Sequence, residues 1–389
     1  MIQNFDYFQP TKIKFGAGRI AEIGDFVSEY GKKCVLVTVP LFDDFEPIID
    51  KVKLSLNKSG VSFIHFDKVI QNPTTDIITQ GTDIANDFGA EVVLGLGGGS
   101  SMDSAKAIAV EAMHDGTAWD YLFFKEKQPN YKTLPIITAT TTAGTGSQVT
   151  QVAVLSNSKE KRKSAIYNSI IFPKVSIVDP ELTITVPPHI TASTGFDVFT
   201  HAFEAYIHKN TSPYVELISL ESIRLVIKNL PMVIKDGKNL QARTEMSWAD
   251  TLAGLSIANA GVTLPHGIGM AIGGCCSNIM HGEALAAVYP EFIKYTYKSS
   301  IRKFATLARL FDQKLENVSD NIAAEKACYL VSKFLNNIDM NRGLEKLGVS
   351  VAEITEIAEK SMELPDYTNN PRVANIDEVT ELLKNSYKY

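Results

Sequence analysis

The sequence predicts a protein in two parts, an α/β half built on a mostly parallel sheet and an all-helical half. From about residue 11 to residue 179, short apolar runs alternate with amphipathic stretches, which is typical of parallel strands covered by helices on both faces. After residue 188, helix-length patterns follow one another without strands between them. Pro180 and the pair Pro187-Pro188 interrupt regular structure, so we expect one domain over 1–184 and a second over 185–389.

The expected strands are short runs rich in Val, Ile and Leu. They lie, in order, at 33–39, 61–67, 92–97, 134–138, 151–156 and 175–179. The expected helices repeat their apolar residues every three or four positions, so that one face of each is buried. They lie, in order, at 45–56, 75–88, 189–208, 214–228, 242–258, 283–295, 301–311 and 323–337.

The composition points to a small molecule as the partner. The chain has 389 residues, enough for two domains of roughly 100–200 residues each. Its 38 Lys and Arg stand against 44 Asp and Glu, and no long run of like charge occurs. This balance argues against nucleic-acid binding and against a polybasic membrane anchor, so we expect neither nucleic acid nor a membrane as a partner.

Several features favour a cytoplasmic location. The N-terminal residues 1–10 lack the basic and apolar regions of a signal peptide. The four cysteines contain no C-x-x-C pair, which is typical of reduced thiols. Residues 253–276 carry no formal charge, but Asn259, Thr263 and Pro265 make them a poor membrane span and a better buried segment around a polar site.

A glycine turn follows the apolar run at 92–97. Gly97, Gly98 and Gly99 allow a ligand close to the backbone, and the N-terminus of the following helix favours a phosphate. Ser100 and Asp103 have the spacing of a capping box. The motif is neither G-x-G-x-x-G nor a P-loop, and a tight strand-to-helix turn is the alternative explanation.

A second loop strengthens the case for a phosphate. Residues 139–150, rich in Thr and Gly, follow another expected strand and are placed to donate hydroxyl and N–H groups to the same ligand. Together the two loops predict a pyrophosphate cradle.

An aspartate and three histidines form a candidate metal site. Asp197 and His201 are four residues apart, so they project from one face of a helix. His266 and His281 are each followed by glycine, which leaves room beside the side chain. One carboxylate and three neutral imidazoles are ligands for a divalent transition metal and leave it a net charge of +1 as a Lewis acid.

The spacing leaves alternatives open. Each histidine, taken singly, equally fits a hydrogen-bonded core residue. Glu204 and His208 continue the helical stripe of Asp197 and His201, so periodicity does not decide which pair binds. For His65, His114 and His189 the sequence predicts no partner.

Six motifs, in order along the chain, resemble the iron-containing, group III alcohol dehydrogenase family. They are GGGSSMDSAK (97–106), TTAGTGSQVT (141–150), GFDVFTHAFEAYI (195–207), PHGIGM (265–270), HGEAL (281–285) and NPR (370–372). The resemblance implies a Rossmann-like dinucleotide-binding domain, an all-α metal-binding domain, an active site in the cleft between them, and a homodimer or larger homo-oligomer.

The resemblance also implies roles for individual residues. The metal, Fe(II) or Zn(II), would be held by Asp197, His201, His266 and His281 rather than by Glu204 and His208. NAD(H) or NADP(H) would be bound by Val39, Asn72, Gly97, Gly98, Gly99, Ser100, Thr141, Thr142, Thr145 and Lys163. The substrate pocket would include Gln151, Ile257, Val262, Met270 and Asp366. No side-chain base is assigned, because the metal would polarise the carbonyl group and the nicotinamide would give or take the hydride.

Three positions depart from the family's pattern. Met270 stands where many members have a second histidine, which excludes a proton relay through that side chain. Val39 stands where many have an Asp that binds the adenosine ribose and repels a 2′-phosphate. Asp366 stands where a small residue or Cys is common near the substrate.

We therefore expect an NAD(P)-dependent, iron-type alcohol dehydrogenase or aldehyde reductase for short-chain substrates, diols included. One alternative is a relative for charged substrates, such as a hydroxyacid dehydrogenase or a maleylacetate reductase. A second alternative is a protein that binds nucleotide and metal without turnover. The four-ligand set argues against a glycerol dehydrogenase, in which one protein ligand is typically absent.

Overall fold

The computed structural model describes residues 4–388, which divide into two compact units. The sheet unit comprises residues 8–187 and 237–247, and the helical unit comprises the remaining described residues. The chain thus enters the sheet unit twice. The single domain boundary at 184/185 stays a prediction.

The sheet unit is built on the predicted parallel sheet, which the structure confirms. Its six strands are all parallel and follow the order β1-β8-β5-β4-β2-β3. The strands are β1 (Lys12–Phe15), β2 (Lys33–Val37), β3 (Ser62–Phe66), β4 (Val92–Gly97), β5 (Ile136–Thr140) and β8 (Val175–Val178). Because all six run the same way, their carboxyl ends lie along one edge, where ligands bind in such sheets.

The strand expected at 151–156 forms, but it does not join this sheet. It is β6 (Val152–Asn157), which pairs antiparallel with β7 (Arg162–Tyr167) in a separate two-stranded sheet. The cause is the short turn between them, because strands joined by a few residues pair antiparallel whereas a parallel pair needs a long crossover.

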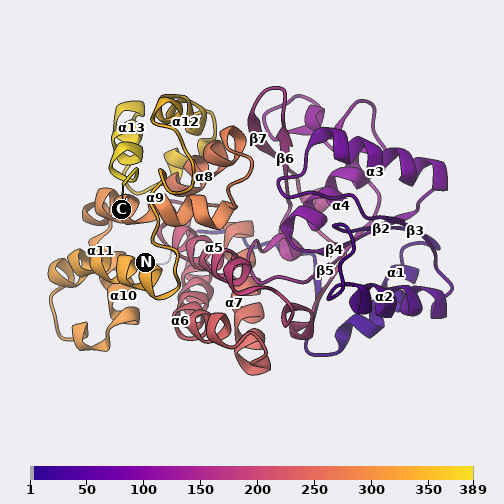
Figure 1. Cartoon of the computed structure of the whole chain (residues 1–389), viewed down its shortest axis with the longest axis horizontal. Helices are drawn as coiled ribbons and strands as arrows, with labels where there is room; N and C mark the ends of the chain where they lie inside the picture. The colour runs from indigo at the N-terminus through magenta and orange to yellow at the C-terminus, as the bar shows by residue number, and fades with distance from the viewer. Residues whose placement is uncertain (1–3, 389) are drawn as a thin grey trace. The chain divides into compact units, whose positions relative to one another are not determined.

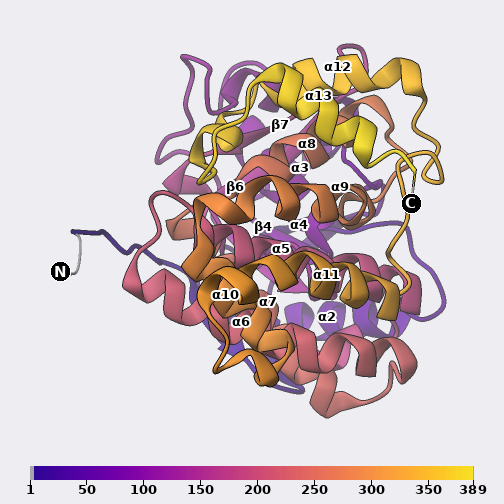
Figure 2. The ribbon, with the colours of Figure 1, turned by 90° about the vertical axis from the view of Figure 1, so that its left-hand side faces the viewer.

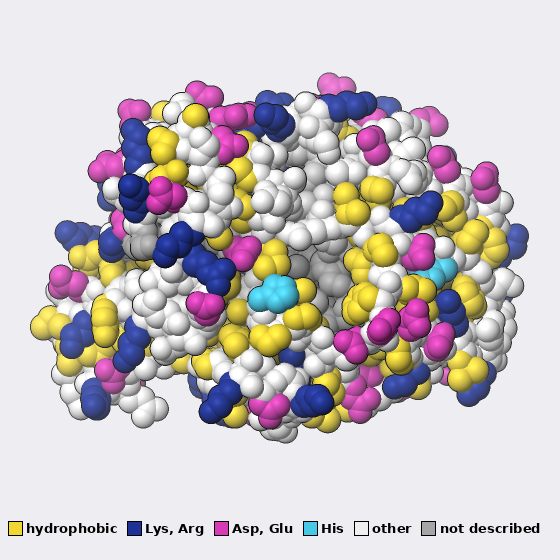
Figure 3. Space-filling model, viewed as in Figure 1, with side chains coloured by type: hydrophobic (Ala, Val, Ile, Leu, Met, Phe, Trp, Pro, Cys, Tyr) yellow, Lys and Arg dark blue, Asp and Glu magenta, His cyan; other side chains and the backbone are white. Residues whose placement is uncertain are grey.

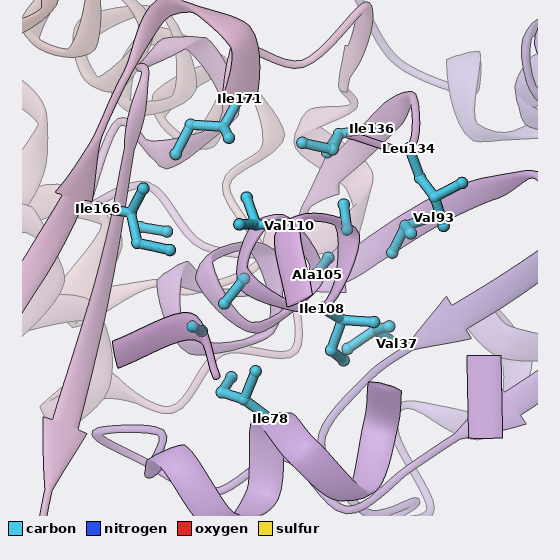
Figure 4. Packing of buried hydrophobic residues seen from close by; sticks show 14 of the residues in the cluster. Val37, Ile78, Val93, Ala105, Ile108, Val110, Leu134, Ile136, Ile166 and Ile171 are labelled. Atoms are coloured by element: carbon cyan, nitrogen blue, oxygen red, sulfur yellow. The ribbon is translucent and has the colours of Figure 1, made fainter. Parts of the chain in front are cut away.

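Helices cover both faces of the sheet, as expected. They are α1 (Ile23–Ser28) and α2 (Glu46–Lys58) on one face, and α3 (Thr75–Phe88) and α4 (Gly99–Glu111) on the other (Figure 1). Side chains alternate along each strand, so Val35 and Val37 of β2 pack with α3 and α4 while Cys34 and Leu36 pack with α1 and α2. Figure 4 shows the first of these cores, in which Val37 and Val93 lie close to the α4 side chains.

The helical unit carries nearly all the remaining helices. They are α5 (Pro188–Ile207), α6 (Pro213–Lys235), α7 (Leu240–Asn259), α8 (Leu264–Cys275), α9 (His281–Thr296), α10 (Ile301–Phe311), α11 (Asp320–Asn337), α12 (Ile354–Ser361) and α13 (Ile376–Asn385); the first residues of α7 belong to the sheet unit. Helix α5 is central, because its rings Phe196, Phe199 and Phe203 are all buried and Tyr289 of α9 packs against the first two. Helices α10 and α11 pack side by side (Figure 2).

Among the described residues, no single helix is both long and apolar enough to cross a membrane. Helices α7 and α8 reach that length and composition only as a pair that bends by 100° at the break between them. On the face drawn in Figure 3, basic and acidic side chains are interspersed.

Candidate active site

The predicted glycine turn connects β4 to α4. Gly97 has a φ of 143°, which disfavours any residue with a side chain, and Gly98 is the N-cap of a helix whose N-terminus no side chain caps. A Cβ on Gly99 would lie 2.5 Å from Thr145 Cγ2, so the Thr-rich loop packs directly on the turn. The first N–H groups of α4 therefore remain available for an anion.

The capping box expected from Ser100 and Asp103 does not form. Gly98 takes the N-cap position, and the buried Asp103 carboxylate accepts hydrogen bonds from Ser147 Oγ at 2.6 Å and from the Val154 N–H at 3.0 Å. Asp103 thus joins α4 to the second loop rather than capping its own helix.

Lys106 is a residue of this region whose role the sequence did not reveal. Its side chain is fully buried, and its ammonium donates to the carbonyl oxygens of Ser147 at 2.7 Å, Thr150 at 2.9 Å and Val152 at 2.7 Å. Burial lowers the pKa of Lys106 to about 8, although the nearby Asp103 carboxylate opposes that shift. The lysine holds the loop after β5 against α4, and its place in the GGGSSMDSAK motif was the available signal.

Two further nucleotide-binding candidates lie together. Lys163 of β7 donates from Nζ to Asn72 Oδ1 at 2.8 Å. Asn72 has a φ of 52° in the loop before α3. Thr141 also lies at the glycine turn, since its N–H donates to the carbonyl oxygen of Gly97 at 3.0 Å.

Val39, the residue at the family's discriminating position, follows β2 and is half-buried. The hydroxyl oxygen of its neighbour Thr38 lies 2.8 Å from His65 Nε2. The sequence predicted no partner for His65, and this contact corrects that prediction. The end of β2 thus carries the Thr38 hydroxyl beside the His65 imidazole. At position 39 it carries a valine in place of the aspartate that many family members have.

Three of the predicted metal ligands form one buried cluster in the helical unit. Asp197 and His201 come from α5 and His266 from α8, and one ligand atom of each lies within 4.8 Å of the others. Asp197 Oδ1 lies 3.7 Å from His201 Nε2 and 3.6 Å from His266 Nε2. These separations exceed a hydrogen bond but suit ligands at about 2.0–2.2 Å from one tetrahedral ion.

His281 lies beside this cluster as the first residue of α9. Its ring centroid is 5.2 Å from that of His266. A Cβ on Gly269 would lie 3.1 Å from His281 Cε1, so the glycine leaves the imidazole its space. Burial disfavours the charge on Asp197, but His201 and His281 outweigh it and hold the pKa of that carboxyl below its ordinary value.

Glu204 contacts His266, one of the candidate ligands, and is not part of the three-residue cluster. Its Oε1 lies 2.8 Å from His266 Nδ1, and its Oε2 accepts from the Thr263 N–H at 2.8 Å. A proton on Nδ1 leaves the Nε2 lone pair directed at Asp197, the arrangement found for metal-bound histidines. Burial alone would lower the pKa of His266, yet the carboxylates of Glu204 and Asp197 raise it to about 10 in the absence of a metal.

His208, the other alternative left open by the periodicity, lies outside the cluster. Its Nδ1 accepts from the Asn210 N–H at 2.9 Å, and burial lowers its pKa to about 4. Helix α5 thus carries two ligand candidates and the carboxylate that contacts His266, whereas the buried, neutral His208 lies one residue past its end.

Replacing Glu204 with glutamine is expected to weaken binding of a divalent metal by about 10- to 100-fold, because an amide supports the Nδ1–H tautomer of His266 less well than a carboxylate does. Titration of the metal-free protein with Zn(II) or Fe(II) measures this. The half-exposed Glu221, changed to glutamine, is the matched control and keeps wild-type affinity. Equal affinities in the two variants would show that Glu204 does not orient His266.

The substrate-pocket candidates divide between the two units. Met270, Ile257, Val262 and Asp366 are partly exposed residues of the helical unit. Met270 lies one turn after His266 on α8. Gln151 belongs to the sheet unit, where its Nε2 donates to the hydroxyl of Tyr167 at 2.8 Å.

Comparison with known families covers both units. Residues 10–180 match the family described as iron-containing alcohol dehydrogenase, and residues 191–387 match the C-terminal region of the Fe-containing alcohol dehydrogenase family.

Individual relatives match along nearly the whole chain. The NAD-dependent methanol dehydrogenase of Bacillus methanolicus is 29% identical, covering 98% of this chain and 99% of its own. The 1,3-propanediol dehydrogenase of Klebsiella pneumoniae is 33% identical, covering 98% and 99%. The solved structure of an archaeal halo-thermophilic Red Sea brine pool alcohol dehydrogenase superposes with a TM-score of 0.95 at 33% identity, covering 99% of this chain and 100% of that one.

Proposed function

The chain belongs to the iron-containing alcohol dehydrogenase family and is an oxidoreductase of that family, and we propose that it interconverts short-chain alcohols and aldehydes with a nicotinamide as hydride carrier. The observation that carries the proposal is the buried cluster of Asp197, His201 and His266, with Glu204 behind it. A cluster of this kind is suited to holding a Lewis-acidic metal ion.

The residues present fit a divalent metal. His266 Nε2 is buried, and in residues 4–388 no group lies within hydrogen-bond distance of it. Asp197, His201 and His266, joined by His281, would hold Fe(II), with Zn(II) as the alternative. The ion would polarise the substrate oxygen.

The chain's own residues set the electrostatics of the reaction. Asp197 contributes one negative charge to the ion, and the charge of Glu204 is directed at His266 Nδ1 and the Thr263 amide instead. Met270, one turn beyond His266, carries no titratable proton, so its side chain does not relay a proton at this position.

In the sheet unit we propose that the α4 N-terminus binds the pyrophosphate of the nicotinamide cofactor. Its support is the pair of loops that meet at Gly99 and Thr145, fastened by Lys106. Lys163 and Asn72 would contact the same ligand. A homo-oligomeric state stays a prediction from the family resemblance, and a cytoplasmic location stays a prediction from the N-terminal residues and the cysteines.

The direct test is consumption of NADH or NADPH by the Fe(II)- or Zn(II)-loaded protein with a panel of short-chain aldehydes. We expect consumption with at least one pairing of cofactor and metal. If every pairing is inactive while nucleotide and metal both bind, the protein is a binding protein and the proposal is wrong.

The choice between NADH and NADPH is proposed to be weak, because Val39 neither bonds a ribose hydroxyl nor repels a 2′-phosphate. Val39→Asp is expected to raise the ratio of kcat/KM with NADH to kcat/KM with NADPH by about tenfold. This lies within the roughly 1–3 kcal/mol that a hydrogen bond to a charged group contributes. Val39→Asn supplies a hydrogen bond without the charge and should shift the ratio less. An unchanged ratio in both variants would assign selectivity to other residues of that loop.

A further inference from the structure

Asp366 is an acidic residue beside the metal-ligand cluster that the proposed chemistry does not use. It belongs to a short 3-10 helix, η9 (Pro365–Asn369), which packs on α8. A Cβ on Gly267 would lie 3.7 Å from both Asp366 Cβ and Oδ2. Because Gly267 directly follows His266, the carboxylate lies at the first turn of the helix that carries a metal ligand.

The Asp366 carboxylate has no bonding partner among residues 4–388: no hydrogen bond and no ion pair reaches its oxygens. Burial raises the pKa of Asp366 to about 7; the charge of His266 opposes this shift and that of Glu204 adds to it. The neighbouring carboxylates differ, since Glu204 is fully engaged and Asp197 faces two histidines. An unpaired carboxylate at a partly exposed position is available to a ligand.

The candidate pocket residues near Asp366 are apolar. Met270 is four residues after His266 and three after Gly267 on α8, so its side chain is a neighbour of each of these two positions on the helix surface. Ile257 and Val262, also partly exposed, add apolar surface to the candidate pocket. Asp366 is therefore the acidic group that a substrate reaching the cluster along this face of α8 would meet.

We propose that Asp366 is a specificity-determining residue whose carboxylate accepts a hydrogen bond from the far end of the substrate. The favoured substrates are then alcohols that carry a donor there, either a second hydroxyl or an ammonium group. Alcohols that end in a methyl group lose this bond, and those that end in a carboxylate are repelled. This inference rests on the proposed alcohol–aldehyde activity.

The test compares alcohols of similar length that differ at the far end: 1-butanol, 1,3-propanediol, 3-amino-1-propanol and 3-hydroxypropionate. Wild type, Asp366→Asn and Asp366→Ala are assayed for kcat and KM separately, with metal content measured on each sample. In wild type we expect the better of the two donor-bearing alcohols to exceed 1-butanol in kcat/KM by about 10- to 100-fold. Asp366→Ala should remove that advantage, mainly through KM, and narrow the discrimination against 3-hydroxypropionate.

The asparagine variant separates the two donor types. An amide still accepts from a hydroxyl but has lost the charge that favours ammonium. If the donor is a hydroxyl, Asp366→Asn keeps the preference for 1,3-propanediol, and if it is ammonium, the preference for 3-amino-1-propanol falls. Asp377, an exposed acid on α13, serves as the matched control, and Asp377→Ala should keep the wild-type ranking.

A binding measurement makes this inference independent of turnover. The four alcohols are titrated calorimetrically into metal-loaded wild type and Asp366→Ala without nicotinamide. If wild type oxidises none of the four and reduces no aldehyde, the proposed function fails, while the titrations still decide whether Asp366 recognises a donor. The inference is overturned if metal-replete Asp366→Ala binds and ranks the four alcohols as wild type does.

Discussion

Replacing His266 with alanine is expected to abolish tight metal binding and to lower kcat/KM for alcohol oxidation by about 1,000-fold or more. His266 Nε2 lies 3.6 Å from Asp197 Oδ1 inside the buried cluster. Its loss therefore removes one proposed ligand, the same one whose Nδ1 contacts Glu204. Lewis-acid stabilisation contributes several kcal/mol to such reactions, and about 1.4 kcal/mol corresponds to each factor of ten in rate.

Metal content by mass spectrometry and NADH fluorescence, measured on the same samples, test this prediction. NADH binding should stay near its wild-type strength, because the proposed nucleotide loops belong to the sheet unit whereas His266 belongs to the helical unit. The exposed His189, at the start of α5, provides the control variant His189→Ala, with wild-type metal content and activity. Full occupancy and normal turnover in His266→Ala would refute the assigned metal site.

The same measurements on His281→Ala decide the fourth ligand. Its ring lies 5.2 Å from that of His266, centroid to centroid, close enough to share an ion. We expect reduced metal content and turnover. Normal values for both would leave a site of three protein ligands.

Most of the fold could be predicted from periodicity, and the missed elements show why some could not. The strand β1 reads KIKF and β7 reads RKSAIY, and both mix charged with apolar residues because each is exposed on part of its surface. Neither forms the apolar run that identifies a buried strand. The central strands, buried on both faces, do form such runs.

For the site, spacing could bring together only residues on one helix. The four-residue interval between Asp197 and His201 is a local property of α5, but Glu204 on α5 and His208, one residue past its end, continue the same sequence spacing. What separates their roles is the approach of α8, which brings His266 Nδ1 to 2.8 Å from Glu204. That long-range packing has no signature in helical periodicity, and only the family resemblance favoured Asp197 and His201, the pair that lies with His266 in the cluster.

Lys106 illustrates the same limit in the sheet unit. A lysine in a helix is normally solvated, and lysine is almost never fully buried unless it is paired. Here it is fully buried, because Ser147, Thr150 and Val152 direct carbonyl oxygens at its ammonium and Asp103 lies nearby. The sequence shows the lysine but not the loop that surrounds it.

Lys106→Met is therefore expected to lower the free energy of unfolding by about 3–5 kcal/mol and to weaken nucleotide binding. The substitution leaves three carbonyl oxygens, two of them in buried bonds, without the lysine donor and the half-buried Asp103 without its countercharge, a loss of the size seen when one partner of a buried pair is removed. Denaturant unfolding and NADH fluorescence measure the two effects, with exposed Lys132→Met as the control. The double variant Asp103→Asn with Lys106→Met should lose less than the sum of the two single variants, because the uncompensated charge is gone. Strict additivity, or a stable Lys106→Met that binds NADH normally, would show that the lysine does not hold the Thr-rich loop in place.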